Sequence, residues 1–368
     1  MKLQDFDYHL PRNLIAQHPT PQRDHSRLMV VDRKTRAREH RFFSDLPRYL
    51  QPGDVLVLNE TKVLPARLIG KKQSGGKIEI LLVRKREWQE GKINSNEEAG
   101  QETDKKKKDW SSEWECLVKN SGKLRENTLI SFDQELQGVL LKRTSSGLWS
   151  LGLKGEGQSA EKLRDIGFPP LPPYIHRNGD WRVRAQDLER YQTVYARMEG
   201  SIAAPTAGMH FTEALLDEIK GKGISVCPLT LHVGLGTFLP VKQEEVEKHY
   251  LEPEFFEVSS ETAGVINKAR ALGQRVIAVG TTVTRALESC FDEQGVIQPK
   301  RGVTDLFILP GFSFRAVDVL ITNFHLPRST LLMLVSAFAG KEFILAAYDE
   351  AIREKYRFYS YGDAMLII

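Results

Sequence analysis

The chain has 368 residues, of which 41% are hydrophobic and 27% are charged. This composition is typical of a folded protein and excludes wholesale disorder. The formal net charge of +4 is too small to indicate nucleic-acid binding by itself, although it permits a local basic patch. The longest mostly apolar run, 331–339, is far shorter than the ~20 residues that cross a membrane. Because the first residues also lack the apolar core of a secretory signal, we expect a cytoplasmic protein.

In chain order, the first strong element is the continuously apolar run 54–59, which is typical of a strand buried on both faces. Short runs of alternating polarity follow it, separated by turn residues: 77–83, 113–118, 128–132, 136–142 and 148–153. Closely spaced strands with no helical period between them predict a small antiparallel β-barrel. Within it, 85–113 is almost entirely polar and contains the run Lys105–Lys108, which predicts a mobile loop.

Beyond the barrel, strands and helices alternate. The runs 275–280 and 318–323 predict further buried strands. Helices are predicted at 259–273, which begins at a serine cap and stops at a glycine, and also at 281–291 and 328–340.

We therefore predict an α/β fold in which a sandwich-like α/β catalytic domain is interrupted by the barrel. The expected domain limits are 1–69 with 156–368 for the discontinuous α/β domain, and 70–155 for the insertion.

Polar residues follow each of the three buried strands. They are Asn59, Thr61 and Arg67 after the first strand, Gly280, Thr281, Thr282 and Arg285 after the second, and Asn323 and His325 after the third. Ligands of open α/β sheets bind beyond the carboxyl ends of the strands, so these clusters predict one binding site at a single edge.

Two loops rich in small residues have a similar character. The loop 201–216 holds Thr206, Gly208, His210 and Phe211, and the loop 231–238 holds His232, Gly234 and Thr237. Glycines let a backbone approach a ligand closely, although a tight turn explains them equally well.

The histidines fit more than one role. A loop histidine is suited to acid–base catalysis, so His210 and His325 are candidates, with a structural hydrogen bond as the alternative. His232 lies in a strand-like alternation that favours a core histidine. No histidines stand at the spacing of a zinc site, and no nucleophile elbow, Walker loop or GxGxxG motif is present. The residues alone thus indicate an α/β enzyme that binds a nucleotide-like ligand.

Several long segments resemble signature blocks of the S-adenosylmethionine:tRNA ribosyltransferase-isomerase family of queuosine biosynthesis. These are 54–68, 204–216, 231–241, 279–289, 322–340 and 356–367. The resemblance runs from Met1 to Ile368. It implies an α/β domain with a barrel insertion and no metal. It also implies transfer of the ribosyl part of S-adenosylmethionine, a co-substrate, to the aminomethyl group of 7-aminomethyl-7-deazaguanine at the wobble position of tRNA. Rearrangement gives epoxyqueuosine, and adenine and methionine leave.

This chemistry suggests roles for the candidate residues. We expect His210, His325 and Asn323 to be catalytic, and the other strand-end and loop residues named above to bind S-adenosylmethionine. The aromatic rings of Phe211, Phe238 and Phe324 are candidates for contact with the sulfonium, with burial in the core as the favoured alternative for each.

Basic side chains in the segment 174–184 are candidates for gripping tRNA phosphates: Arg177, Arg182 and Arg184. A solvated linker is the alternative there, and the protein is expected to be a monomer. The alternative functions are an S-adenosylmethionine-dependent RNA methyltransferase and a non-catalytic RNA-binding protein.

Overall fold

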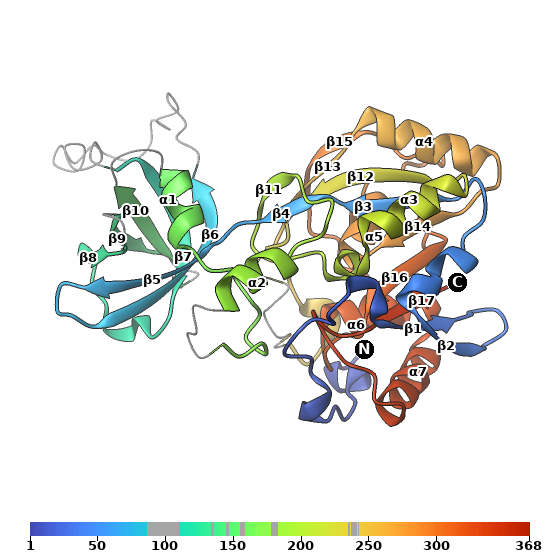
Figure 1. Cartoon of the computed structure of the whole chain (residues 1–368), viewed down its shortest axis with the longest axis horizontal. Coiled ribbons are helices and arrows are strands. Elements are labelled where there is room, and N and C mark those ends of the chain that lie inside the picture. The colour runs from blue at the N-terminus through green and yellow to red at the C-terminus, as the bar shows by residue number, and fades with distance from the viewer. Residues whose placement is uncertain are drawn as a thin grey trace. The chain divides into compact units, whose positions relative to one another are not determined.

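The computed structural model describes residues 1–86, 110–133, 136–144, 147–154, 159–177, 183–234, 236, 241 and 243–368 (Figure 1). The chain divides into two compact units, Met1–Lys62 with Leu171–Ile368, and Val63–Pro170. The domain limits expected at 70 and 155 stay a prediction. The first barrel strand begins at Arg67.

The smaller unit contains a closed six-stranded barrel, as the alternating runs predicted. Its strands are β5 (Arg67–Lys72), β6 (Lys77–Arg86), β7 (Ser112–Val118), β8 (Thr128–Ser131), β9 (Gln137–Arg143) and β10 (Trp149–Lys154). They pair in the order β10-β7-β6-β5-β8-β9, with every neighbour antiparallel. Alternate residues such as Ile78, Ile80 and Leu82 are buried, which explains the period of two. A short helix, α1 (Ser159–Ile166), follows β10. Most of the expected polar loop, including Lys105–Lys108, lies outside the described residues.

The larger unit is built on a mixed nine-stranded sheet. Its strands are β1 (Arg27–Val31), β2 (Arg38–Phe42), β3 (Val55–Asn59), β12 (Ser225–Leu231), β13 (Glu254–Val258), β14 (Val276–Val279), β15 (Lys300–Thr304), β16 (Val319–Asn323) and β17 (Ala364–Ile367). The order is β15-β13-β12-β3-β14-β16-β17-β1-β2. The four strands from β12 to β16 are parallel, whereas β17 runs antiparallel to β16. A separate two-stranded ribbon pairs β4 (Thr61–Val63) with β11 (Met198–Ser201).

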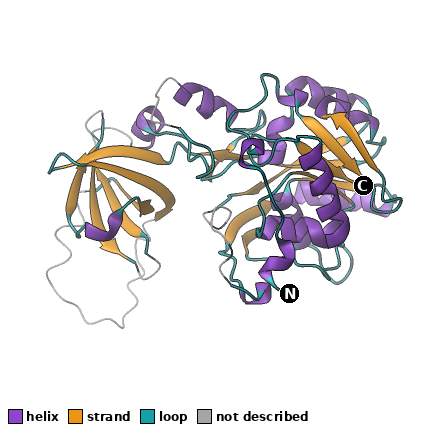
Figure 2. Ribbon diagram, turned by 90° about the horizontal axis from the view of Figure 1, so that it is seen from below, coloured by secondary structure: helices purple, strands orange, loops and turns teal. Residues whose placement is uncertain are grey.

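Helices lie against this sheet (Figure 2). They are α3 (Glu213–Gly221), α4 (Ser260–Ala271), α5 (Thr281–Glu288), α6 (Thr330–Ala339) and α7 (Lys341–Arg353). The short helix α2 (Arg184–Arg190) contributes none of its described residues to the two hydrophobic clusters that cover the sheet. Short 3₁₀ helices of this unit occur at Leu3–Phe6, Arg12–Leu14, Arg23–His25, Phe43–Arg48, Thr206–His210 and Val246–Lys248, and one of the barrel unit occurs at Ser121–Lys123. The side chains of Thr212, Ser259 and Ser329 cap α3, α4 and α6 by accepting a backbone N–H.

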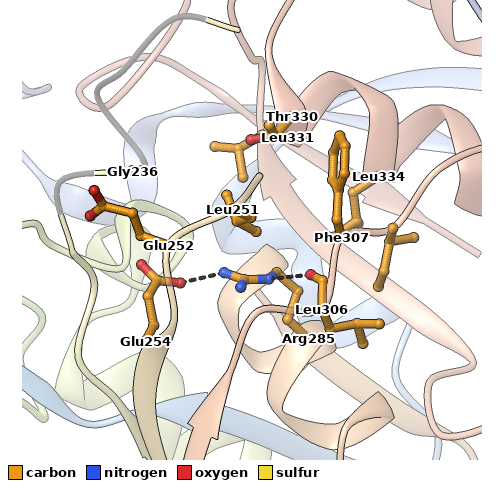
Figure 3. A pocket seen from close by; sticks show the side chains of 11 residues that line it. Gly236, Leu251, Glu252, Glu254, Arg285, Leu306, Phe307, Thr330, Leu331 and Leu334 are labelled. Atoms are coloured by element: carbon orange, nitrogen blue, oxygen red, sulfur yellow. Dashed lines mark hydrogen bonds and ion pairs between the residues drawn. The ribbon is translucent and has the colours of Figure 1, made fainter. Parts of the chain in front are cut away.

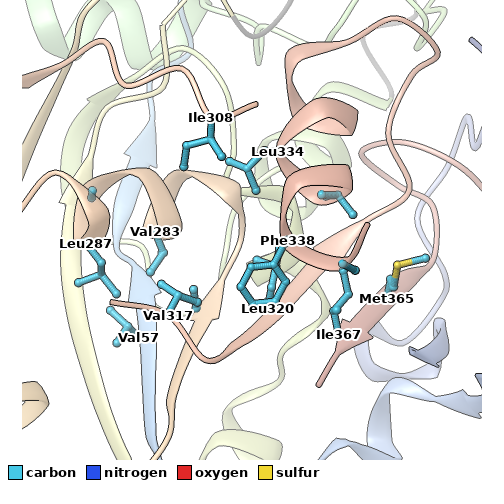
Figure 4. Packing of buried hydrophobic residues seen from close by; sticks show 14 of the residues in the cluster. Val57, Val283, Leu287, Ile308, Val317, Leu320, Leu334, Phe338, Met365 and Ile367 are labelled. Carbon is cyan, nitrogen blue, oxygen red and sulfur yellow. The ribbon is translucent and has the colours of Figure 1, made fainter. Parts of the chain in front are cut away.

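Both faces of the sheet are buried, which explains why its central strands are continuously apolar. On one face, Val57 and Leu320 pack with residues of α5 and α6 such as Val283 and Leu334 (Figure 4). On the other face, Leu56 and Ile321 pack with α3 and the 3₁₀ helix Phe43–Arg48. The mixed α/β fold with an antiparallel barrel therefore confirms the predicted fold class.

No single described helix is long and apolar enough to span a membrane, although α6 and α7 satisfy the length and composition criteria as a pair bent by 113°.

Candidate active site

Several chain segments meet around one cavity of about 100 Å³ in the larger unit. The parallel strands β14 and β16 end side by side, so the residues that follow them reach the same edge of the sheet. Of the residues predicted for the site, seven line this cavity: Thr206, Gly280, Thr281, Thr282, Arg285, Asn323 and His325. Phe324, a candidate for contact with the sulfonium, lines it as well.

Asn323 lies at the end of β16 with 2% of its surface exposed. Its Nδ2 donates to His210 Nε2 and to the Tyr359 carbonyl oxygen, each at 3.1 Å. Because the carbonyl oxygen of Tyr359 can only accept a hydrogen bond, the amide atom of Asn323 that faces it must be the nitrogen. The other atom, Oδ1, is buried and has no hydrogen-bond partner among the described residues. A buried orphaned acceptor is costly, so this oxygen is suited to receive an N–H or O–H from a ligand.

His210 stands behind Asn323 and is not among the residues that line the cavity. Its Nδ1 lies 2.7 Å from Ser26 Oγ, while its Nε2 accepts from Asn323. Burial, together with the charges of Arg357 and Arg23, lowers the pKa of His210 to about 3. The ring is therefore neutral near pH 7, with its proton on Nδ1, and it holds the Asn323 amide in place.

His325 lines the cavity itself. Its Nε2 lies 2.7 Å from the Thr322 hydroxyl, and its backbone N–H donates to the Tyr348 hydroxyl at 3.0 Å. Burial lowers the pKa of His325 to about 3, so this imidazole is also neutral at physiological pH. When Thr322 donates to Nε2, the imidazole proton resides on Nδ1, which has no partner among the described residues.

The start of α5 forms another wall of the cavity. Gly280 adopts a φ of +97° between β14 and α5, a conformation that side-chain-bearing residues rarely adopt. Thr281 and Thr282 then begin the helix, where unpaired N–H groups and the helix dipole favour electronegative groups. The N-cap of α6, Ser329, also lines the cavity.

Arg285, one turn into α5, is buried and already paired. It forms an ion pair with Glu254 of β13 and donates from Nε to the Leu306 carbonyl oxygen at 2.9 Å (Figure 3). Glu254 also accepts the backbone N–H of Gly234 at 2.8 Å. Arg285 lines both the main cavity and the adjoining small hollow drawn in Figure 3. Its guanidinium therefore ties α5 to β13 and to the loop after β12.

Other predicted residues support the site from behind. The side chain of Asn59 is fully buried and bonds to both the N–H and the C=O of Leu231 and to the N–H of Thr61, so its amide joins β3 to β12. Thr61 Oγ1 lies 2.8 Å from His232 Nδ1, and the His232 ring stacks on Phe255. None of these three predicted residues is among those lining the cavity.

The remaining predicted residues lie elsewhere or outside the described parts of the chain. Phe211 is buried against Phe43 in the core, and Gly208 packs closely against Tyr195. Arg67 belongs to the barrel unit and pairs with Glu79. Thr237, Phe238 and Arg182 are not among the described residues.

Of the two described arginines proposed to grip tRNA, Arg177 donates to both carboxylate oxygens of buried Asp187, at 2.7 and 2.9 Å. This bidentate ion pair compensates its charge. Arg184 is the first residue of α2.

Sequence reasoning missed several residues of the cavity. Tyr174, Tyr359 and Ser360 line it, and the rings of Tyr174 and Tyr359 lie 4.6 Å apart. Tyr359 has a φ of +74°, rare for a residue other than glycine, and such strain concentrates at functional sites. Two signals were available for Tyr359 and Ser360: the resemblance of the block 356–367 to the family, and the several aromatic residues around a glycine in 356–363.

Among the residues that the structure describes, no group of three His, Cys, Asp or Glu side chains is arranged to hold a metal ion. The described side chains at the cavity include a buried amide, a neutral imidazole, hydroxyls, aromatic rings, apolar groups and the guanidinium of Arg285, whose charge Glu254 compensates. Such a set can bind an uncharged heterocycle and a cation, and it can exchange hydrogen bonds with both.

A family model described as "Queuosine biosynthesis protein" matches residues 3–367. The chain belongs to this family. It is 49% identical over 370 residues to the S-adenosylmethionine:tRNA ribosyltransferase-isomerase of Halothermothrix orenii, and 47% identical over 368 residues to that of Syntrophotalea carbinolica. Each alignment covers 100% of both chains. The crystal structure of the S-adenosylmethionine tRNA ribosyltransferase of Thermotoga maritima matches 99% of the chain, with 38% identity and a TM-score of 0.53.

Membership of the queuosine biosynthesis family confirms the resemblance read from the sequence blocks. Most of the residues that line the cavity lie in those blocks, within 204–207, 280–285, 322–331 and 359–360, whereas Tyr174, Tyr191 and Ala203 lie outside them. The roles of individual side chains rest on the contacts described above.

Proposed function

We propose that this chain is an S-adenosylmethionine:tRNA ribosyltransferase-isomerase. It transfers the ribosyl part of S-adenosylmethionine to the aminomethyl group of 7-aminomethyl-7-deazaguanine at the tRNA wobble position and isomerises it, which yields epoxyqueuosine and releases adenine and methionine. The observation that carries this proposal is the 47–49% identity, over the full length of both chains, to relatives of that name. S-adenosylmethionine is thus a substrate rather than a resident cofactor.

Asn323 and His325 would hold the adenine of S-adenosylmethionine. The cavity is large enough for a heterocyclic base, and the orphaned Asn323 Oδ1 suits an exocyclic amine. A neutral His325 with its proton on Nδ1 donates a hydrogen bond to a ring nitrogen. That bond strengthens as adenine departs with the electron pair of the glycosidic bond, which makes His325 a leaving-group stabiliser.

His210 would act through Asn323 rather than on the substrate. Its pKa of about 3 makes it a poor proton acceptor near pH 7. Its contacts with Ser26 and Asn323 support a positioning role instead.

The sulfonium would lie against aromatic rings. Tyr174, Tyr359 and Phe324 all line the cavity, and an aromatic face attracts a cation by ~0.5–2 kcal/mol. The positive sulfur acidifies the neighbouring C5′–H, so the substrate amine or a side chain can remove that proton.

We further propose that the protein is a monomer and that it acts in the cytoplasm, where its tRNA substrate is found. Arg184 stays a candidate for contact with tRNA.

Product analysis separates this function from its rivals. Incubation of the chain with S-adenosylmethionine and tRNA that carries 7-aminomethyl-7-deazaguanine should yield adenine and methionine in equal amounts, measured by chromatography. S-adenosylhomocysteine would instead identify a methyltransferase. Tight tRNA binding with no turnover of S-adenosylmethionine would identify a non-catalytic RNA-binding protein.

A further inference from the structure

Beside the cavity stand two arginines that form no ion pair with any carboxylate in the described part of the chain. Arg23, in a 3₁₀ helix near the N-terminus, and Arg190, at the end of α2, line a small hollow together with His210 and Ser360. Ser360 also lines the main cavity, and His210 bonds directly to Asn323. The hollow therefore adjoins the proposed catalytic cavity.

Both guanidinium groups are held in place by main-chain carbonyl oxygens. Arg23 donates from Nη1 to Gln192 and Met209, at 2.8 and 3.1 Å, and from Nη2 to Glu189 at 3.0 Å. Arg190 donates to the carbonyl oxygens of Thr20 and Pro21, at 2.7 and 3.1 Å. These bonds fix the two positions, but none of them is to a carboxylate.

Each guanidinium has donors to spare. A guanidinium carries five N–H donors, so Arg23 keeps two unused and Arg190 keeps three. Arg190 Nε is buried and has no partner among the described residues. By contrast, Arg177 on the segment before α2 is paired bidentately with Asp187.

Two positive charges act on each other and on His210 at the hollow, although the more distant charge of Glu189 partly offsets that of Arg23. Burial and the neighbouring charge of Arg190 lower the pKa of Arg23, and Arg23 in turn helps to lower the pKa of His210. Among the described residues, no carboxylate forms an ion pair with either arginine. Holding two like charges together is costly, and a bound anion removes that cost.

We propose that Arg23 and Arg190 form a phosphate-binding subsite for the backbone of the substrate tRNA, an inference that rests on the proposed function. The hollow, about 20 Å³, is too small to enclose a nucleotide. A single phosphodiester bound at the rim of the hollow fits its size. Two guanidinium groups suit the oxygens of a phosphodiester. A phosphate bound there anchors the tRNA strand next to the cavity that its wobble base must reach.

Salt-dependent binding of tRNA tests the subsite. Each phosphate contact adds about one to the slope of log affinity against log salt. Arg190→Gln should weaken tRNA binding at least ~10-fold at low salt and reduce that slope by about one, while the dissociation constant of S-adenosylmethionine stays unchanged. Arg190→Lys should retain most of the slope. The matched control, Arg301→Gln, removes an exposed charge on β15 and should leave both quantities near the wild-type values.

A second variant guards against loss of folding in Arg190→Gln. Thr20→Glu adds a negative charge at the rim and keeps both guanidinium groups, because Thr20 contacts Arg190 through its carbonyl oxygen. It should weaken tRNA binding by at least as much as Arg190→Gln, while its unfolding temperature stays at or above that of the wild type, because the new carboxylate relieves the repulsion between the two guanidinium groups.

Two failures are distinguishable. If the wild type releases no adenine, the proposed function is wrong. If the wild type is active but Arg190→Gln and Thr20→Glu bind tRNA with the wild-type affinity and salt slope, the phosphate subsite is wrong. The subsite is also wrong if the variants weaken binding of S-adenosylmethionine instead, since the arginines would then serve its carboxylate.

Discussion

The amide of Asn323 is fixed on one side by His210 and Tyr359, whereas its oxygen is buried without a partner. Replacing Asn323 by Ala removes this acceptor and should lower kcat/KM for S-adenosylmethionine about 10- to 100-fold, since one buried hydrogen bond is worth ~1–3 kcal/mol when its partner is left unpaired. Steady-state release of adenine measures the effect.

Asn267→Ala is the matched control. The Asn267 amide bonds to both backbone groups of Ile297, away from the cavity. Its loss should lower stability and leave kcat/KM nearly unchanged. Equal kinetic effects in the two variants would contradict a substrate contact at Asn323.

The pKa of His325 predicts a pH dependence of stability. Its folded pKa is about 3, against 6.5 for the free side chain. Because the unfolded state binds the proton more tightly, His325 makes the protein less stable as pH falls from 6.5 towards 3. Between pH 7 and pH 5 this one group should lower the free energy of unfolding by about 2 kcal/mol.

Denaturant unfolding of His325→Asn at these two pH values checks the sign. The variant should lose less stability than the wild type on acidification. His249→Asn replaces a less buried histidine and should behave more like the wild type. If His325→Asn loses as much stability between pH 7 and pH 5 as the wild type does, the pKa of His325 is the same in the folded and unfolded states, which would contradict this prediction.

At the scale of elements, the turn between β14 and α5 sets the position of Thr281 and Thr282. A Cβ at Gly280 would meet no atom closer than 3.6 Å, so its φ of +97° rather than crowding makes substitution costly. Gly280→Ala should destabilise the protein by ~1–2 kcal/mol and reduce kcat/KM. Gly264→Ala, in the middle of α4 with open space around it, should instead stabilise by up to ~1 kcal/mol. Thermal unfolding compares the two variants, and the same sign for both would contradict this account.

The central strands were predictable because each is buried either on both faces or on one face, and each case leaves its own pattern of apolar residues. Strands β3, β14 and β16 are buried on both faces and hence read as continuous apolar runs, and the barrel strands alternate because only one face is buried. The edge of the sheet was harder to predict. The strand β2 is mostly exposed, and β17 pairs with β16 and β1, which are remote from each other in sequence.

At the scale of the whole molecule, the pairing of β17 with β16 and β1 explains which residues of the site the sequence revealed and which it did not. Asn323 and His325 were predictable because one ends a parallel strand and the other lies two residues beyond it. Tyr359 reaches them because antiparallel β17 starts where β16 ends, with Ala364 opposite Asn323. Arg23 and Arg190 likewise come together only through tertiary contacts. No local pattern encodes such pairings, nor does one indicate that Arg177 is neutralised by Asp187.

The central claim is that segments distant in sequence enclose one cavity that binds S-adenosylmethionine. Ala204 lines that cavity and is 6% exposed, so a larger side chain there occupies ligand space. The most direct measurement is the dissociation constant of S-adenosylmethionine for Ala204→Leu by equilibrium dialysis, with Ala271→Leu at the exposed end of α4 as the control. The account predicts binding at least ~10-fold weaker in Ala204→Leu and unchanged in the control. Wild-type affinity in a folded Ala204→Leu protein would contradict it.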